Sequence, residues 1–191
     1  PVHTDAGQAF GSLPVNFRAA GVDTMAISGH KIGGPVGVGA LVVGRAVKLT
    51  PVMHGGGQER DIRSGTLDTP GIAAFAAAAR EATENLPAES ARLRQLRDTL
   101  IAGVEREIPD AVLRGAREEQ SGDTDRQGMP RRLPGNAHFT FPGCEGDSLL
   151  FLLDLAGVES STGSACTAGV PRPSHVLLAM GLSETEARGA Q

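Results

Sequence analysis

The sequence predicts an α/β fold, and three observations support this prediction. Short apolar runs rich in β-branched residues alternate with glycine-rich turns over the first 43 residues. Two later stretches have apolar residues at three- and four-residue spacings, which is typical of amphipathic helices. Further short strands and helices alternate to the end of the chain, and such alternation is the pattern of a sheet covered by helices.

Three short strands are expected at the beginning of the chain. Residues 2–5 form the end of one strand, residues 23–28 form a second, and residues 38–43 form a third whose composition is typical of a buried sheet. The segment 30–35, His-Lys-Ile-Gly-Gly-Pro, is predicted to be a loop or tight turn because glycine and proline interrupt regular structure.

Two helices are predicted next. The first begins at Thr69 and Pro70, because threonine is a good N-cap and proline suits the first helical position. Its expected apolar face consists of Ile72, Phe75, Ala76 and Ala79. The second helix is expected from about residue 88 to residue 107. Its apolar stripe consists of Leu93, Leu96, Leu100, Ile101, Val104 and Ile108.

The last part of the chain begins with a polar segment at residues 115–132. This segment is charged and lacks apolar periodicity, which predicts an exposed loop. The elements expected after it are a strand at 137–141, a helix at 147–155, a strand at 158–161, a loop of small residues at 162–169, and short helices at 173–180 and 183–188.

The composition excludes several classes of function. A net charge of -4 provides no broad positive surface for nucleic acid or anionic lipid, and no apolar run approaches the roughly 20 residues that span a bilayer. Two cysteines are too few for a disulfide framework in 191 residues, so we expect a reducing, cytoplasmic location. The chain begins with Pro-Val-His, and both ends fall inside patterned sequence, so we expect a piece of a longer protein.

Lys31 is the first candidate for chemistry. It follows a predicted strand and precedes a run of glycines, where a flat cofactor can approach the backbone, and a neutral lysine amine can attack a carbonyl group. Asp5 also follows a strand and could pair with the protonated ring nitrogen of a pyridine cofactor, while Gln8 could donate to the ring oxygen. Taken alone, Lys31 could equally be a surface lysine, and Asp5 could be a residue that initiates a turn.

Cys166 is the second candidate. It lies among small and hydroxyl-bearing residues, in a loop that would leave its sulfur accessible as a nucleophile, although a spectator cysteine is the alternative. Cys144 is interpreted as incidental, because its acidic neighbours disfavour a thiolate. No metal site is predicted, since the histidines and cysteines lack ligand spacing, and the glycine-rich segments match neither a dinucleotide fingerprint nor a P-loop.

Five motifs occur in the order in which one enzyme family has them. They are His3-Thr4-Asp5-Ala6-Gly7-Gln8, Ser28-Gly29-His30-Lys31, His54-Gly55-Gly56-Gly57-Gln58-Glu59, Arg63-Ser64-Gly65-Thr66 and Ser161-Thr162-Gly163-Ser164-Ala165-Cys166. With these motifs the chain resembles the carboxyl-terminal half of the cysteine desulfurases of the NifS/IscS group. These are class V, fold-type I enzymes that depend on pyridoxal 5'-phosphate (PLP). The Gly-Ser-Ala-Cys-Thr segment narrows the resemblance to this group.

The resemblance implies a partial fold-type I PLP-dependent transferase. Residues 1–86 would be the distal part of the large PLP-binding domain, and residues 87–191 would be most of the small C-terminal domain, which carries the cysteine loop. Lys31 would bond covalently to PLP and move protons on the substrate. Asp5 would pair with the pyridinium nitrogen, and Gln8 would bond the ring oxygen.

The resemblance also implies how the phosphate is held and how sulfur is transferred. Ser28 and His30 would bind the phosphate, and Thr66 would reach the phosphate of the partner subunit's cofactor, which implies a homodimer. Cys166 would attack the sulfur of the substrate L-cysteine, giving a persulfide and releasing L-alanine. The sulfur would then pass to an acceptor, such as an iron–sulfur scaffold or a protein of tRNA thiolation.

Parts of the family pattern do not occur in this chain. The family's amino-terminal half is missing, and the chain stops at Gln191, before the arginine that binds the substrate carboxylate in the family. We therefore expect the isolated chain to be inactive. The alternatives are another class V PLP enzyme, such as an aminotransferase, which has no use for Cys166, or a selenocysteine lyase, and an inactive fragment that needs a complementary chain.

Overall fold

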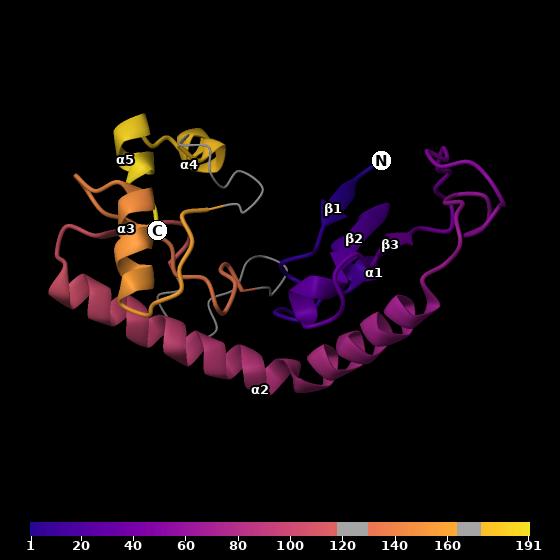
Figure 1. The fold of residues 1–191 in the computed structure, drawn as a ribbon, viewed down its shortest axis with the longest axis horizontal. Coiled ribbons are helices and arrows are strands. Elements are labelled where there is room, and N and C mark those ends of the chain that lie inside the picture. Colours follow the sequence, from indigo (N-terminus) through magenta and orange to yellow (C-terminus); the bar gives the residue numbers. More distant parts are fainter. Residues whose placement is uncertain (118–129, 164–172) are drawn as a thin grey trace. The chain divides into compact units, whose positions relative to one another are not determined.

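The computed structural model describes residues 1–117, 130–163 and 173–191. The chain divides into two compact units, Pro1–Arg92 and Leu93–Gln191. Helix α2 (Thr69–Glu107) contributes residues to both units, because it runs through the boundary between them. Mixed strands and helices confirm the α/β class (Figure 1). The domain boundary expected after residue 86 remains a prediction.

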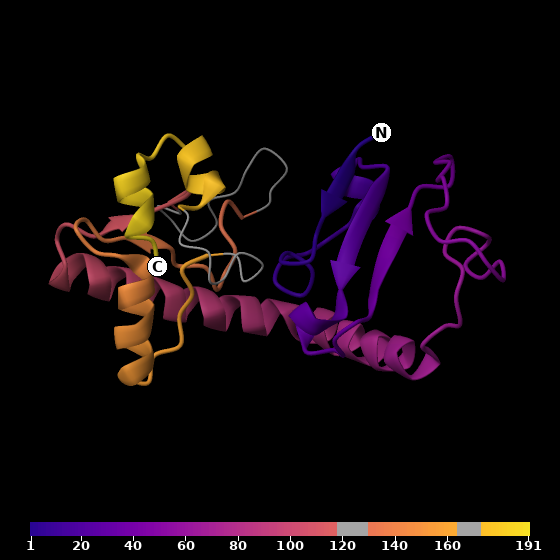
Figure 2. The ribbon, with the colours of Figure 1, turned by 45° about the horizontal axis from the view of Figure 1, so that its top comes forward.

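The first unit contains a sheet of three strands, and all three were predicted. They are β1 (His3–Asp5), β2 (Thr24–Ser28) and β3 (Gly39–Val43), in the order β1-β2-β3, and Figure 2 shows them side by side. Strand β1 runs parallel to β2, whereas β3 is antiparallel to β2. The parallel pairing brings the carboxyl ends of β1 and β2 to the same edge of the sheet.

Two short helical segments flank β2. Helix α1 (Phe17–Ala20) was not predicted, because four residues are too few to show a helical period. Asn16 caps α1 by accepting hydrogen bonds from the backbone amides of Arg18 and Ala19, at 3.0 and 3.1 Å. The segment after β2, predicted as a loop or turn, begins with a turn of 3-10 helix, η1 (Gly29–Ile32).

Helix α2 differs from the prediction of two separate helices. It is one helix of 39 residues, and Pro87 lies inside it. Proline removes one intrahelical hydrogen bond, but the helix continues past it. The predicted N-cap is wrong by one position: the Asp68 carboxylate accepts from the Gly71 amide at 3.1 Å, so Asp68 caps the helix and Thr69 is its first residue.

The second unit contains a small antiparallel sheet. Strand β4 (Val112–Leu113) was not predicted, and it pairs with β5 (Phe139–Thr140), which is shorter than the predicted strand at 137–141. The strand predicted at 158–161 is wrong, because those residues have no regular structure. The end of the chain instead pairs with β5: the Phe139 amide donates to the Gln191 carbonyl, and the reverse hydrogen bond also forms, both at 2.9 Å.

Among the residues that the structure describes after β5 there are three helices, and all three were predicted. They are α3 (Gly146–Leu155), α4 (His175–Ala179) and α5 (Glu184–Arg188). A capping box begins α5, in which Ser183 accepts from the Glu186 amide and the Glu186 carboxylate accepts from the Ser183 amide. No helix among the described residues is both long enough and apolar enough to cross a membrane.

The predicted exposed loop at 115–132 needs correction at its end. Arg132 is buried, with 8% of its surface exposed. Its guanidinium donates hydrogen bonds to the carbonyl oxygens of Arg114 and Ala116 and to the side-chain oxygen of Asn136. Buried polar groups are stable only when they are hydrogen-bonded, and these contacts meet that need. Arg132 therefore holds segments on either side of residues 118–129.

His138 lies near Arg132 and Arg114. From its surroundings we predict that the stability of the protein depends on pH. Burial lowers the pKa of His138 below its ordinary value, and the charges of Arg132 and Arg114 lower it further. Below about pH 6.5 the unfolded chain therefore binds a proton at this residue more readily than the folded chain does. The free energy of unfolding is expected to fall as the pH drops through this value.

Urea unfolding at about pH 7.5 and about pH 5 measures this effect. His138→Gln should lose less stability on acidification than the unchanged protein. His54→Gln, at an exposed position, is the matched control and should behave like the unchanged protein. An equal loss of stability in His138→Gln and the unchanged protein would contradict the prediction.

Candidate active site

The candidate site lies where the parallel strands β1 and β2 end. Asp5 is the last residue of β1, and Ser28 is the last residue of β2. Asp5 pairs with Ala26 in the register of the two strands, and the amide of Ala6 donates to the Ala26 carbonyl at 2.9 Å. The structure therefore brings Asp5 and Ser28 to one edge of the sheet, where parallel α/β sheets commonly bind ligands.

Gly7 is buried beside Asp5 and holds its carboxylate. The Gly7 amide donates to Asp5 Oδ1 at 2.8 Å, which fixes the orientation of the carboxylate. A Cβ atom at position 7 would lie 3.0 Å from Asp5 Oδ1 and 3.6 Å from the Ser28 hydroxyl. Any larger residue would fill this space. The prediction did not single out Gly7, although its place between Asp5 and Gln8 in the motif was a usable signal.

His30 and Lys31 lie in η1, directly after Ser28, and both are exposed. Their turn is closed by hydrogen bonds from the Gly34 amide to the Gly29 carbonyl and from the Gly29 amide to the Val38 carbonyl, each of 2.9 Å. Gln8 is exposed in the turn that follows β1, where the Phe10 amide donates to the Ala6 carbonyl at 2.8 Å. The turns that follow β1 and β2 thus carry three candidate groups, which are the amide of Gln8, the imidazole of His30 and the amine of Lys31.

Thr66 follows a loop that is held by its own hydrogen bonds. The Gly65 amide donates to Gln58 Oε1 at 2.9 Å, and the Gly57 amide donates to the Ser64 hydroxyl at 3.3 Å. Three consecutive residues, 59–61, have φ angles of 50, 58 and 62 degrees, a conformation that is strained for side chains of this kind. Thr66 itself is exposed, so the loop presents it at the surface of the first unit.

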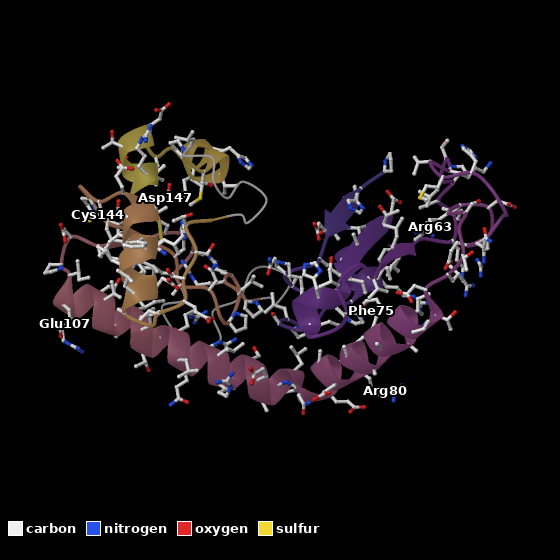
Figure 3. All side chains as sticks on the ribbon, viewed as in Figure 1. Arg63, Phe75, Arg80, Glu107, Cys144 and Asp147 are labelled. Carbon is white, nitrogen blue, oxygen red and sulfur yellow. The ribbon has the colours of Figure 1, made fainter. Side chains whose placement is uncertain are left out.

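Cys166 lies outside the described residues, so its placement remains a prediction. Cys144 is described: it is a free, half-buried cysteine in the turn before α3, where its amide donates to the Phe141 carbonyl at 3.2 Å (Figure 3). Nothing in these contacts gives Cys144 a chemical role.

The side chains at this edge of the sheet include the chemical groups that a pyridine cofactor with a phosphate requires. A carboxylate can pair with a ring nitrogen, an amine can bond to an aldehyde carbon, and hydroxyl and imidazole groups can bind phosphate oxygens. Gly7 has no side chain that would crowd the Asp5 carboxylate, and Asp5 is exposed at this edge. The residues present therefore fit PLP.

Comparisons with known proteins identify the family of the chain. The family described as aminotransferase class V matches residues 1–187. The IscS-like cysteine desulfurase of Mycobacterium tuberculosis is 56% identical over 190 residues, which are 100% of this chain and 46% of that protein.

Two solved structures are also similar. A NifS-like protein from Rickettsia africae has a TM-score of 0.81 at 32% identity, over 98% of this chain and 46% of its own. SspA in complex with cysteine has a TM-score of 0.65 at 33% identity, over 100% of this chain and 48% of its own. The chain thus spans about half the length of the curated relatives it matches. The resemblance to the cysteine desulfurases is confirmed, and the chain belongs to the class V aminotransferase family, whose desulfurases are PLP enzymes.

Proposed function

We propose that this chain is the part of a PLP-dependent cysteine desulfurase that carries the cofactor lysine, Lys31, and the sulfur-accepting cysteine, Cys166. The enzyme would convert L-cysteine to L-alanine and transfer the sulfur to Cys166 as a persulfide. The observation that carries the proposal is that Asp5 and Ser28 lie at one edge of the sheet, with Lys31 in the turn that follows Ser28. The desulfurase names of the relatives and the cysteine bound to SspA support this choice of substrate.

The residues at the sheet edge would each act on a different part of the cofactor. When bound, PLP supplies an electron sink for bonds at the substrate carbon atoms. The Asp5 carboxylate would keep the ring nitrogen protonated, because a nearby negative charge favours the charged form. Gln8 would donate to the ring oxygen, and Ser28 and His30 would donate to the phosphate.

Lys31 and Cys166 would divide the chemistry. The amine of Lys31 would tether the cofactor and carry a proton to and from the substrate Cα. The Cys166 thiolate would form a bond to the substrate sulfur as the bond between that sulfur and Cβ breaks. The electron pair left on the substrate would then take up a proton, which gives the methyl group of alanine. Sulfur would remain on Cys166 as a persulfide.

The proposal extends to partners and location. Thr66 of one subunit would bind the cofactor phosphate of the other, which requires a homodimer. The persulfide sulfur would pass to an acceptor protein of iron–sulfur cluster assembly or tRNA thiolation. We place this reaction in the cytoplasm, where a thiol that must stay reduced is protected from disulfide formation.

The test is product analysis with the protein that contains the whole family fold. With PLP, L-cysteine and a thiol reductant, alanine and sulfide should appear in equal amounts. Formation of a keto acid in place of alanine would support an aminotransferase and contradict the desulfurase. Residues 1–191 alone should be inactive, because they span about half the length of the relatives.

Asp5→Asn tests the contact with the ring nitrogen. Asparagine has nearly the same shape and can still accept from the Gly7 amide, so the local fold should be retained. The loss of charge should reduce the rate of alanine formation by about 100-fold or more, because a preorganised charge at the reacting centre is lost. Alanine formation at saturating PLP measures this effect. Asp110→Asn, at an exposed position, is the control, and an unchanged rate in Asp5→Asn would exclude the assigned contact.

A further inference from the structure

Gly11 and Ile32 make a close contact between the two turns that carry Gln8 and Lys31. A Cβ atom at Gly11 would lie 2.6 Å from Ile32 Cγ2, closer than real Cβ atoms approach other atoms, and 3.5 Å from the Cβ of Ala82. The side chain of Ile32 therefore occupies the space that a side chain at position 11 would need. We call this space the Gly11 notch. Gly11 also has a φ of +81 degrees, which glycine adopts without strain.

Small residues of helix α2 pack against these turns. Ala78 and Ala82 are four residues apart and lie on the same face of α2. Ala82 borders the Gly11 notch, and a Cβ atom at Gly34 would lie 3.3 Å from the Cβ of Ala78. Phe75, on the same side of the helix, is buried, whereas Arg80 extends from the opposite side (Figure 3). Small residues at these positions let both turns approach the helix closely.

The turn that carries Lys31 is therefore fixed on both sides of the lysine. On one side, Gly29 packs against Val38, where a Cβ atom would lie 3.0 Å from the Val38 carbonyl oxygen. On the other side, Ile32 fills the Gly11 notch and Gly34 lies against Ala78. The side chain of Lys31 is exposed. The contacts of the backbone and of Ile32 therefore fix the position of the Lys31 backbone, from which its amine extends.

We propose that Gly11 and Ile32 are positioning residues, whose contact sets the spacing between the Lys31 turn and the Gln8 turn. This inference rests on the proposed function, because it concerns where the amine of Lys31 meets the cofactor. A methyl group in the notch would displace Ile32 and with it the adjacent Lys31. A misplacement of about 1 Å at a reacting group can cost about 100-fold in rate.

Three variants test the proposal. Gly11→Ala fills the notch. Gly21→Ala is the matched control, because Gly21 has a φ of +64 degrees but a Cβ atom there would meet nothing within 4 Å. The control therefore carries the backbone strain without the clash. Ile32→Ala empties the notch without backbone strain, and it keeps the proposal testable if Gly11→Ala does not fold.

Two measurements are made on each variant. The first is hydrogen exchange of the amides at residues 29–34. The second is the rate at which borohydride traps PLP on Lys31 at saturating PLP, located by peptide mass spectrometry. Gly11→Ala and Ile32→Ala should each exchange faster and trap at least about tenfold more slowly, whereas Gly21→Ala should match the unchanged protein in both measurements. The double variant Gly11→Ala/Ile32→Ala should trap faster than Gly11→Ala, because the clash is removed.

The outcomes separate this proposal from the proposed function. If the unchanged protein traps PLP on Lys31 and folded Gly11→Ala and Ile32→Ala do so at the same rate, the positioning role is overturned and the desulfurase proposal stands. Faster exchange without slower trapping also overturns it, because the contact would then be structural only. If the unchanged protein traps PLP on Lys48 or on no lysine, the assignment of Lys31 fails, and the positioning role fails with it.

Discussion

Replacing Lys31 with alanine is expected to abolish the covalent attachment of PLP and to reduce cysteine turnover by at least about 1,000-fold. Removal of a group that bonds covalently in a reaction typically causes a loss of this size or larger. Lys31 lies in η1, the turn that directly follows Ser28 at the end of β2. Without it, no amine in this motif can tether the cofactor or carry the proton.

The visible absorbance of the bound cofactor and mass spectrometry after borohydride reduction both measure the attachment. Lys31→Arg should fail as Lys31→Ala does, because a guanidinium keeps its charge and cannot act as a nucleophile at neutral pH. Lys48→Ala serves as the control and should keep both the colour and the trapped peptide. Persistent colour in Lys31→Ala would show that another group binds the cofactor, and the assignment would then be wrong.

Replacing Cys166 with alanine is expected to stop the formation of alanine and sulfide from cysteine while leaving the spectrum of bound PLP unchanged. The Cys166 thiolate is the proposed sulfur acceptor, and alanine has no atom that can form the sulfur–sulfur bond. The loss of turnover should again be at least about 1,000-fold. The residues proposed to bind the cofactor lie on a different part of the chain, between residues 5 and 66, so binding of PLP should not depend on Cys166.

Cys144→Ala is the matched control, because Cys144 is also a free thiol but lies in the turn before α3. It should retain full activity. If sulfide release survives in Cys166→Ala and is lost in Cys144→Ala, the roles of the two cysteines must be exchanged. Together with Lys31→Ala, the two cysteine variants distinguish loss of cofactor from loss of the sulfur acceptor.

The sequence predicted elements well where a local pattern defines them. The three strands of the first unit and the helices α3, α4 and α5 follow from apolar runs, caps and periodicity over a few neighbouring residues. The errors occur where the partner is distant in sequence. Strand β4 has only two residues, and its pairing with β5 becomes apparent only in the folded chain. The strand expected at 158–161 is absent, and Gln191 makes the backbone hydrogen bonds beside β5.

The apolar face predicted for the first part of α2 is partly wrong, although the residues there are helical as predicted. Predicted Phe75 is buried, but predicted Ile72 is 42% exposed. The face that packs against the rest of the first unit instead includes Ala78 and Ala82. In a helix rich in alanine, more than one stripe has helical spacing, and similar side chains make these stripes equal in hydrophobicity. Only contact with the glycines of the Lys31 and Gln8 turns selects one of them.

For this protein, the order of residues alone determined the motifs, the ends of the strands and the candidate groups, because each is a local property of the chain. Asp5 and Lys31 could be named from their places after predicted strands. Only the tertiary structure decided that Asp5 and Ser28 share an edge, since this depends on the parallel pairing of β1 with β2 across about twenty residues of sequence. It also decided why Gly11 must be a glycine, because the atom that would clash with a side chain there belongs to Ile32, which is distant in the chain.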